Sequence, residues 1–416
     1  MSKKDNVLKE ITMFYLTSRD FNGLSIDLAD CEPELKDILI SLIQEDKISL
    51  LFGDVHINPH IKAFREEPKE KQIGKLRSSS HQYCCAYPSP SHLKEAVDPS
   101  GYQDRPFTLR LALGEPQLSF QSFDLSVLEF YRNDPRYHYR NSNISGSISV
   151  HTQYFESGSM RTSDEVFLQT FGFSYDIELN RAVAVFVRYL SDLSPEHQQI
   201  WNAKTLEGDY KLHPDYYRTS ILGEWQEGIS IFDAFAMELH HINKMCKLME
   251  RPPLFRDEEI KDRSFSFLIR PTSKEYNDFV HLLDKAISEN INRDFFLNDI
   301  PFEYDEIRKS DGKVVVRQKG TIQILDNWLE RMFRVENRQP IEEMIDTFKE
   351  IRRLRQRPAH AIDDDVFDQK YFKEQRELIM RAYKGIRLLR LIFAEHPNVE
   401  GYEVTDYLQS GKIWDI

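Results

Sequence analysis

The sequence predicts a multidomain α+β protein, and three observations support that prediction. The chain has 416 residues, more than one domain usually holds, and 40% of them are hydrophobic, which suffices for folded cores. Apolar residues recur at helical spacing near the N-terminus and through the C-terminal third, whereas they alternate with a period of two in much of the middle. We therefore expect helical domains at both ends and a β-rich domain between them.

Residues 1–64 are predicted to form a winged-helix-like domain. A first helix is expected over residues 5–18, and a second begins at Pro33, which suits the first turn of a helix. Between them lies the short mixed stretch 24–30, and residues 48–57 contain two apolar runs around a Gly-Asp turn. This order of helix, short helix, helix and hairpin is typical of a winged helix. The second long helix is too acidic to read DNA, so we expect a structural or protein-contact module.

The next two segments differ in polarity. Residues 65–105 are polar and rich in Ser and Pro, which indicates a linker or long loop. Residues 106–270 are predicted to form a middle domain that is first β-rich and then helical, with helical spacing at 194–204 and 230–249. Its expected strands are 107–113, 144–150, 167–171 and 183–187.

Aromatic side chains and arginines alternate in one segment of this middle domain. Such a segment can stack bases and hold phosphates, although packed aromatics with solvated arginines explain the same pattern. We keep it as a candidate substrate contact. The residues are Tyr131, Arg132, Arg136, Tyr137, Tyr139 and Arg140.

Residues 271–396 are predicted to form a four-helix bundle. The first helix follows a capping-box pattern at Thr272, the second covers about 321–335, the third begins at Pro340 and the fourth covers about 369–395. A hairpin is expected within the insertion at 293–320, and residues 397–416 form a polar tail.

Positive charge gathers near the end of the third helix of this bundle. The whole chain carries a net charge of -13, so any nucleic-acid site must be a local positive patch. The stretch 349–360 provides one, because it holds five cations and ends in His360, with an Asp-Asp-Asp run at 363–365. The alternative is a solvated basic helix face. The cations are Lys349, Arg352, Arg353, Arg355 and Arg357.

Arg355-Gln-Arg-Pro-Ala-His360 has the form R-x4-H and resembles the signature of the HEPN superfamily, whose members are helical bundles that often act as metal-independent ribonucleases. The resemblance covers only the C-terminal third. It implies that Arg355 holds the scissile phosphate and that His360 moves protons, with no metal or other cofactor. The register Arg353-x6-His360 also fits the looser family pattern, and Gln356 replaces the Asn, Asp or His often found there. Neighbouring side chains would contact the substrate: Arg352, Arg353, Gln356 and Arg357.

The resemblance also implies partners and a biological role. These are an RNA substrate, a homodimer formed through the C-terminal bundle because one motif offers one histidine, and a bacterial anti-phage or toxin-like effector. The N-terminal domains would sense a protein trigger or inhibitor. The alternative is a non-catalytic interaction protein. We expect a cytoplasmic protein without a membrane contact, because the chain lacks a long apolar run and its four cysteines show no CxxC spacing.

Overall fold

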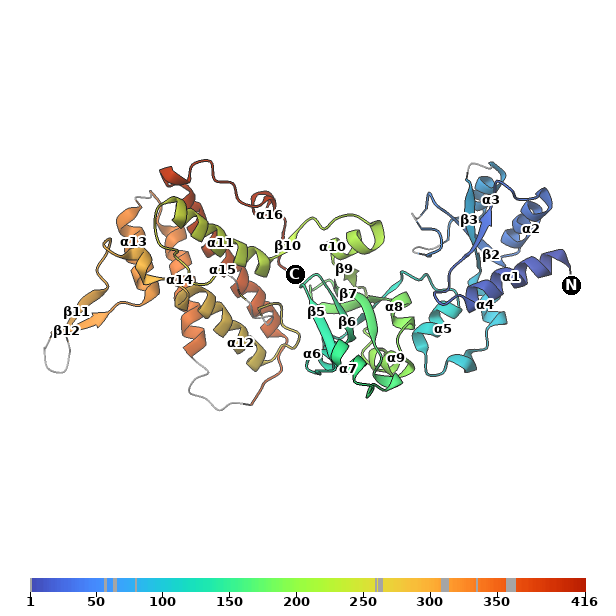
Figure 1. The fold of residues 1–416 in the computed structure, drawn as a ribbon, viewed down its shortest axis with the longest axis horizontal. Coiled ribbons are helices and arrows are strands. Elements are labelled where there is room, and N and C mark those ends of the chain that lie inside the picture. Colours follow the sequence, from blue (N-terminus) through green and yellow to red (C-terminus); the bar gives the residue numbers. More distant parts are fainter. Residues whose placement is uncertain are drawn as a thin grey trace. The chain divides into compact units, whose positions relative to one another are not determined.

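The computed structural model combines helices with mainly antiparallel sheets, which confirms the α+β prediction at that level. It divides into two compact units, Met1–Trp225 and Gln226–Ile416, which are described separately (Figure 1). The described residues are 2–55, 58–62, 66–78, 81–258, 260, 265–307, 314–333, 336–356 and 364–416.

Unit 1 begins with helices packed on a three-stranded antiparallel sheet of order β1-β3-β2. The helix α1 starts in a capping box in which Ser2 and Asp5 exchange hydrogen bonds, and α2 has Pro33 in its first turn, so both expected helices are confirmed. Their apolar sides share a core with the sheet. The elements are α1 (Lys3–Thr17), β1 (Leu24–Asp27), α2 (Pro33–Gln44), β2 (Ile48–Phe52), α3 (Lys69–Ser78) and β3 (Tyr83–Pro88).

This sheet differs from the expected winged helix in two places. The stretch predicted as a short helix forms β1, and β2 pairs with β3 rather than with residues 55–57, of which 56–57 lie outside the described residues. The central strand β3 comes from the stretch 65–105, which was predicted to be a linker. Its residues Cys84–Tyr87 are buried, because Cys84 and Ala86 pack in the core shared with α1 and α2 and the Tyr87 ring packs against Tyr15 of α1. Polar neighbours hide this short apolar run in the sequence.

A second antiparallel sheet of order β4-β8-β7-β6-β5, with β9 beside β7, forms the rest of the unit 1 core. The strands expected at 144–150, 167–171 and 183–187 are confirmed, with bounds that differ by a few residues. The strand expected at 107–113 is wrong, because this stretch forms α5. Pro106 opens that helix, and Phe107 and Leu111, four residues apart, are both buried. The strands are β4 (Phe120–Phe123), β5 (Tyr137–Asn141), β6 (Ser145–Val150), β7 (Phe167–Tyr175), β8 (Arg181–Phe186) and β9 (Lys211–Leu212).

Short helices connect the strands of unit 1. They include the predicted helix at 194–204, which is confirmed as α9. The helices are α4 (Pro90–Ala96), α5 (Pro106–Ala112), α6 (Glu129–Arg132), α7 (Thr152–Glu156), α8 (Val187–Ser191), α9 (Pro195–Asn202) and α10 (Pro214–Tyr217), with single turns η1 (Pro99–Tyr102), η2 (Leu125–Leu128), η3 (Thr162–Asp164) and η4 (Arg218–Leu222).

Gly172 in β7 lies directly under the ring of Tyr216, and a Cβ atom there would be 2.1 Å from that ring. We therefore expect Gly172→Ala to destabilise unit 1 by about 1–3 kcal/mol, because a packed core resists an added methyl group. Urea unfolding of the full chain measures the effect. Gly53→Ala is the control, since no heavy atom lies within 4 Å of the added Cβ. Equal stability of the two variants would contradict this expectation.

Unit 2 is mainly helical and contains the four helices predicted from residue 271 onward. Among the described residues, no helix is both long and apolar enough to cross a membrane. The tail returns to the unit, because β13 near the C-terminus pairs with β10. The elements are β10 (Ile229–Ser230), α11 (Ile231–Leu248), α12 (Ser273–Asp284), η5 (Lys285–Glu289), η6 (Arg293–Phe296), β11 (Glu303–Ile307), β12 (Val314–Gln318), α13 (Thr321–Met332), α14 (Gln339–Gln356), α15 (Lys370–Ala394), η8 (Pro397–Val399), α16 (Asp406–Ser410) and β13 (Ile413–Trp414).

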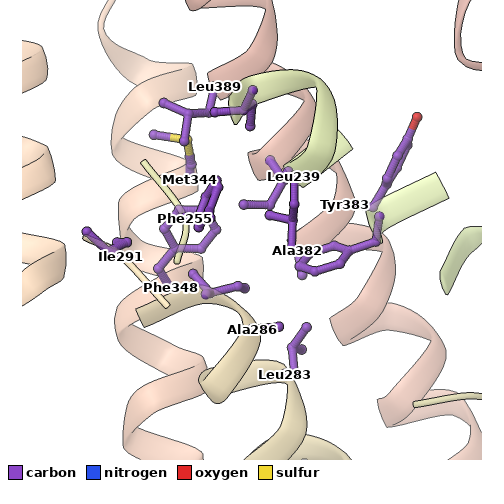
Figure 2. Close-up of a cluster of buried hydrophobic side chains, with 14 of the residues drawn as sticks. Leu239, Phe255, Leu283, Ala286, Ile291, Met344, Phe348, Ala382, Tyr383 and Leu389 are labelled. Carbon is purple, nitrogen blue, oxygen red and sulfur yellow. The ribbon is translucent and has the colours of Figure 1, made fainter. Parts of the chain in front are cut away.

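One core joins α11, α12, α14 and α15 (Figure 2). Leu239 of α11, Leu283 of α12, Phe348 of α14 and Leu389 of α15 are all buried in it. The predicted middle domain included α11, whereas the apolar side of this helix packs here beside α15. Gly385 allows α14 and α15 to approach, since a Cβ there would lie 3.1 Å from Met344 and Phe348. This shared core fixes the end of α14, where the predicted site begins.

Candidate functional site

The described part of the predicted site lies at the C-terminal end of α14. The apolar side of this helix is buried, which leaves Arg352, Arg353, Arg355 and Gln356 off the core, as the sequence predicts. Arg357 and His360 lie outside the described residues, as do Pro358 and Asp363. The structure therefore places four of the six predicted site residues.

Two of these arginines meet a buried carboxylate at the end of α12. Asp284 is fully buried, and its Oδ2 accepts a hydrogen bond from Nη1 of Arg355 at 2.6 Å. Nη1 of Arg352 lies 3.6 Å from the same oxygen. Because a buried charge is unfavourable without a partner, Asp284 holds both guanidinium groups in one place. The Arg355 side chain remains 26% exposed, so it is held by Asp284 and is still open to solvent.

Ser288 and Glu289 complete this cluster. The Ser288 hydroxyl donates to Asp284 and accepts a hydrogen bond from Nη1 of Arg352 at 2.9 Å. Glu289 accepts a second hydrogen bond from Nη1 of Arg355. That bond holds the pKa of the Glu289 carboxyl below its usual value, and the positive charges of Arg355 and Arg352 act in the same direction. The cluster therefore combines two fixed guanidinium groups with two carboxylates.

A wider helical turn brings these groups together. After Asp284, α12 continues into η5, a π-helical turn over Lys285–Glu289. Such turns change the direction of side chains within a helix and are frequent at functional sites. Its Ser288 carbonyl accepts a hydrogen bond from Thr321 Oγ1 at 2.6 Å, which supports the turn from α13.

The chain that follows the motif returns to the first turn of α12. Asp365 Oδ1 accepts a hydrogen bond from the Lys274 backbone N–H at 2.9 Å, and Val366 and Ser273 exchange two further hydrogen bonds. The end of α14 is held by Asp284 at the last residue of α12. Both described flanks of the predicted histidine are therefore anchored on α12.

The side chains of Arg353 and Gln356 are exposed and make no hydrogen bond or ion pair with the part of the chain that the structure describes. They remain candidates for contact with a substrate, which the register Arg353-x6-His360 also allows. The structure groups Arg352 with Arg355 and leaves Arg353 apart from their carboxylate partners.

The aromatic and arginine segment of unit 1 is not a surface for stacking bases. Tyr131 and Tyr137 are buried, and the Tyr131 hydroxyl lies 2.8 Å from Nδ1 of His197 in the core. Arg136 is paired with Asp134 at 2.6 Å and with Asp164 at 3.0 Å. The candidate substrate contact predicted here is wrong, because its rings fill the core and Arg136 is occupied.

The adjacent histidines of α11 have separate partners. His240 Nδ1 lies 2.7 Å from Glu258, and His241 Nδ1 lies 2.7 Å from the Tyr402 hydroxyl. Burial lowers the pKa of His241 to about 4, so this ring is neutral at pH 7. Over the described ranges, no three His, Cys, Asp or Glu side chains gather in a way that could hold a metal ion.

Comparison with known proteins gives no match: no protein-family model matches the chain, and neither does a curated protein or a solved structure. The resemblance to the HEPN superfamily therefore stays a prediction. It depends on the motif that begins at Arg355 and on the helical unit around it.

Proposed function

We propose that unit 2 is a metal-independent endoribonuclease of HEPN type, which acts as an anti-phage or toxin-like effector under the control of unit 1. One observation supports this function most. Arg352 and Arg355 are both fixed on the buried Asp284, at the helix end that leads to His360. Guanidinium groups held in place before a substrate arrives are what the stabilisation of a reacting phosphate requires.

The contacts of Arg355 leave donors for a phosphate. Asp284 and Glu289 are both reached through Nη1, so among the described residues nothing occupies Nε and Nη2, which can form two parallel hydrogen bonds with phosphate oxygens. An unperturbed imidazole titrates at a pKa of about 6.5 and can serve as an acid or a base at pH 7. His360 would therefore take a proton from the 2′-hydroxyl or give one to the leaving oxygen. Because the 2′-hydroxyl is the nucleophile, RNA would be cleaved and DNA would not.

A specific observation favours a second candidate, the non-catalytic interaction protein. Two carboxylates offset the charge of Arg355, and such ion-pair networks also occur where they only stabilise a fold. In that case the ion pairs of Arg355 would only stabilise the packing of α14 against α12. Activity measurements separate the two candidates.

The direct test is incubation of the purified full chain with total RNA in EDTA, beside the variant His360→Ala. We expect cleavage by the wild type and a loss of about 100-fold or more in the variant, because general acid–base catalysis contributes about that much. Absence of cleavage by the wild type, with or without cell extract as a source of trigger, favours the interaction protein. Equal cleavage by the variant shows that His360 is not the catalytic histidine.

Removal of the Glu289 charge is expected to strengthen RNA binding. Glu289 places a negative charge beside Arg355 that repels a phosphate, so Glu289→Gln should lower the dissociation constant for a 2′-O-methylated, uncleavable RNA. The effect on stability should stay below about 1 kcal/mol, since Glu289 is partly exposed. Fluorescence anisotropy measures the binding. Glu342→Gln on α14, whose carboxylate lies 4.0 Å from Arg338, is the matched control. Equal affinities of the two variants would contradict a role of Arg355 in phosphate binding.

A further inference from the structure

The hairpin β11–β12 extends from the helices of unit 2 (Figure 1). Its base is held by the unit, because the Lys319 N–H donates to the Phe302 carbonyl at 2.8 Å and Arg293 Nη2 donates to the Lys319 carbonyl at 3.1 Å. The two strands pair in a regular register in which Ile307 lies opposite Val314. The hairpin is therefore anchored at one end only by these contacts.

One face of this hairpin carries three apolar side chains that are open to solvent, beside two carboxylates. Ile307 is 68% exposed, Val314 60% and Val316 59%. They share a face, because side chains alternate along a strand and Ile307 pairs with Val314. Asp305 and Glu303 lie on the same face, opposite Val316 and Gln318, so its apolar part is mainly on β12. Two-stranded sheets are marginally stable in water, and an open apolar strand readily pairs with another strand. The exposed valines of β12 can therefore be covered by a partner strand.

Charge distinguishes the two strands. The strand β11 carries three carboxylates, Glu303, Asp305 and Glu306, which protect its edge from pairing with a like strand. The strand β12 carries three valines and a single cation, Arg317, whose Nε lies 2.5 Å from Glu306 within the same hairpin. The edge of β12 is thus the one that can accept a further strand.

We propose that β12 pairs antiparallel with β12 of a second copy of this chain, so that two hairpins form one four-stranded sheet. With Val316 at the twofold axis, Val314 lies opposite Gln318 and Val315 opposite Arg317 of the other copy. No like charges then face each other, and Val316 of one copy packs beside Val316 of the other. Pairing through β11 would instead bring the carboxylates of both copies together. The proposal does not depend on ribonuclease activity, although it supplies the second copy that a motif with one histidine calls for.

Sedimentation velocity of the full chain over a range of concentrations tests this proposal. The wild type is expected to form a dimer, and Val316→Lys should raise its dissociation constant about tenfold or more, because two lysines then meet at the axis. Ile307→Lys is the matched control, since it places the same charge on the same face but on β11. It should change the dissociation constant far less.

Three outcomes would overturn the proposal. They are a wild type that stays monomeric at every concentration, a Val316→Lys variant that dimerises like the wild type, and equal loss of the dimer in both variants. Equal loss in both variants would mean that the face carrying Ile307 and Val316, and not the edge of β12, forms the contact between the two copies. Both substituted positions are exposed, and thermal unfolding verifies that each variant remains folded. The cleavage assay of the His360→Ala variant is read independently, so failure of one proposal does not imply failure of the other.

Discussion

Replacement of Arg390 by methionine is expected to destabilise unit 2 by about 3–5 kcal/mol, because it removes the hydrogen-bonded ion-pair partner of a buried carboxylate. Arg390 of α15 donates from Nε to Glu238 of α11 at 2.5 Å, and both side chains are buried. Methionine keeps the apolar stem and removes the charge. Hydrogen exchange at the amides of α11 and α15 measures the loss within unit 2 without contribution from unit 1.

The deficit of this variant should depend on pH. Burial raises the pKa of Glu238 above its ordinary value even beside Arg390, and removal of Arg390 should raise it further. Because the folded pKa then lies above the unfolded one, the deficit is complete above the folded pKa and shrinks as the pH falls through it. The double variant Glu238→Leu, Arg390→Met should recover most of the stability. A single variant as stable as the wild type at neutral pH would show that the pair is not needed.

The sequence predicts the helices of unit 2 well, because their apolar residues recur at three and four positions and Pro340 marks the start of α14. The prediction of secondary structure fails where the apolar residues of a short segment fit both the spacing of a strand and that of a helix. The alternation at 107–113 fits a strand, yet Pro106 and the buried pair Phe107 and Leu111 form α5. The strand β3 was missed because it pairs with β1 and β2, which are distant in the sequence, and local composition does not reveal such pairing.

The sequence predicts the arginines of the candidate site but not the carboxylates that hold them. The apolar stripe of α14 correctly leaves Arg352 and Arg355 free of the core, but it says nothing about their partners. Asp284 lies 71 positions before Arg355, and only the packing of α12 on α14 brings them together. One sequence signal was available, since Asp284 follows Val280 and Leu283 on the apolar side of its helix. A carboxylate on a buried face calls for a cation from elsewhere.

Arg355→Lys is expected to lower RNA cleavage about 100-fold or more while unit 2 remains folded. The lysine ammonium can still pair with the buried Asp284, so the charge of that carboxylate stays compensated. A single ammonium lacks the planar fork that would hold Asp284 and a phosphate together, and loss of one such donor commonly reduces a rate by that factor. Arg381→Lys is the matched control, because Arg381 of α15 pairs with Glu350 of α14 at 2.5 Å and not with Asp284 or Glu289.

The rate of RNA cleavage in EDTA, measured side by side for the wild type, Arg355→Lys and Arg381→Lys, tests the proposed ribonuclease most directly. We expect the wild type and Arg381→Lys to cut at similar rates, with Arg355→Lys slower by about two orders of magnitude. Equal rates for Arg355→Lys and the wild type would contradict the assignment of Arg355 to the phosphate, and a wild type without any cleavage would contradict the function itself.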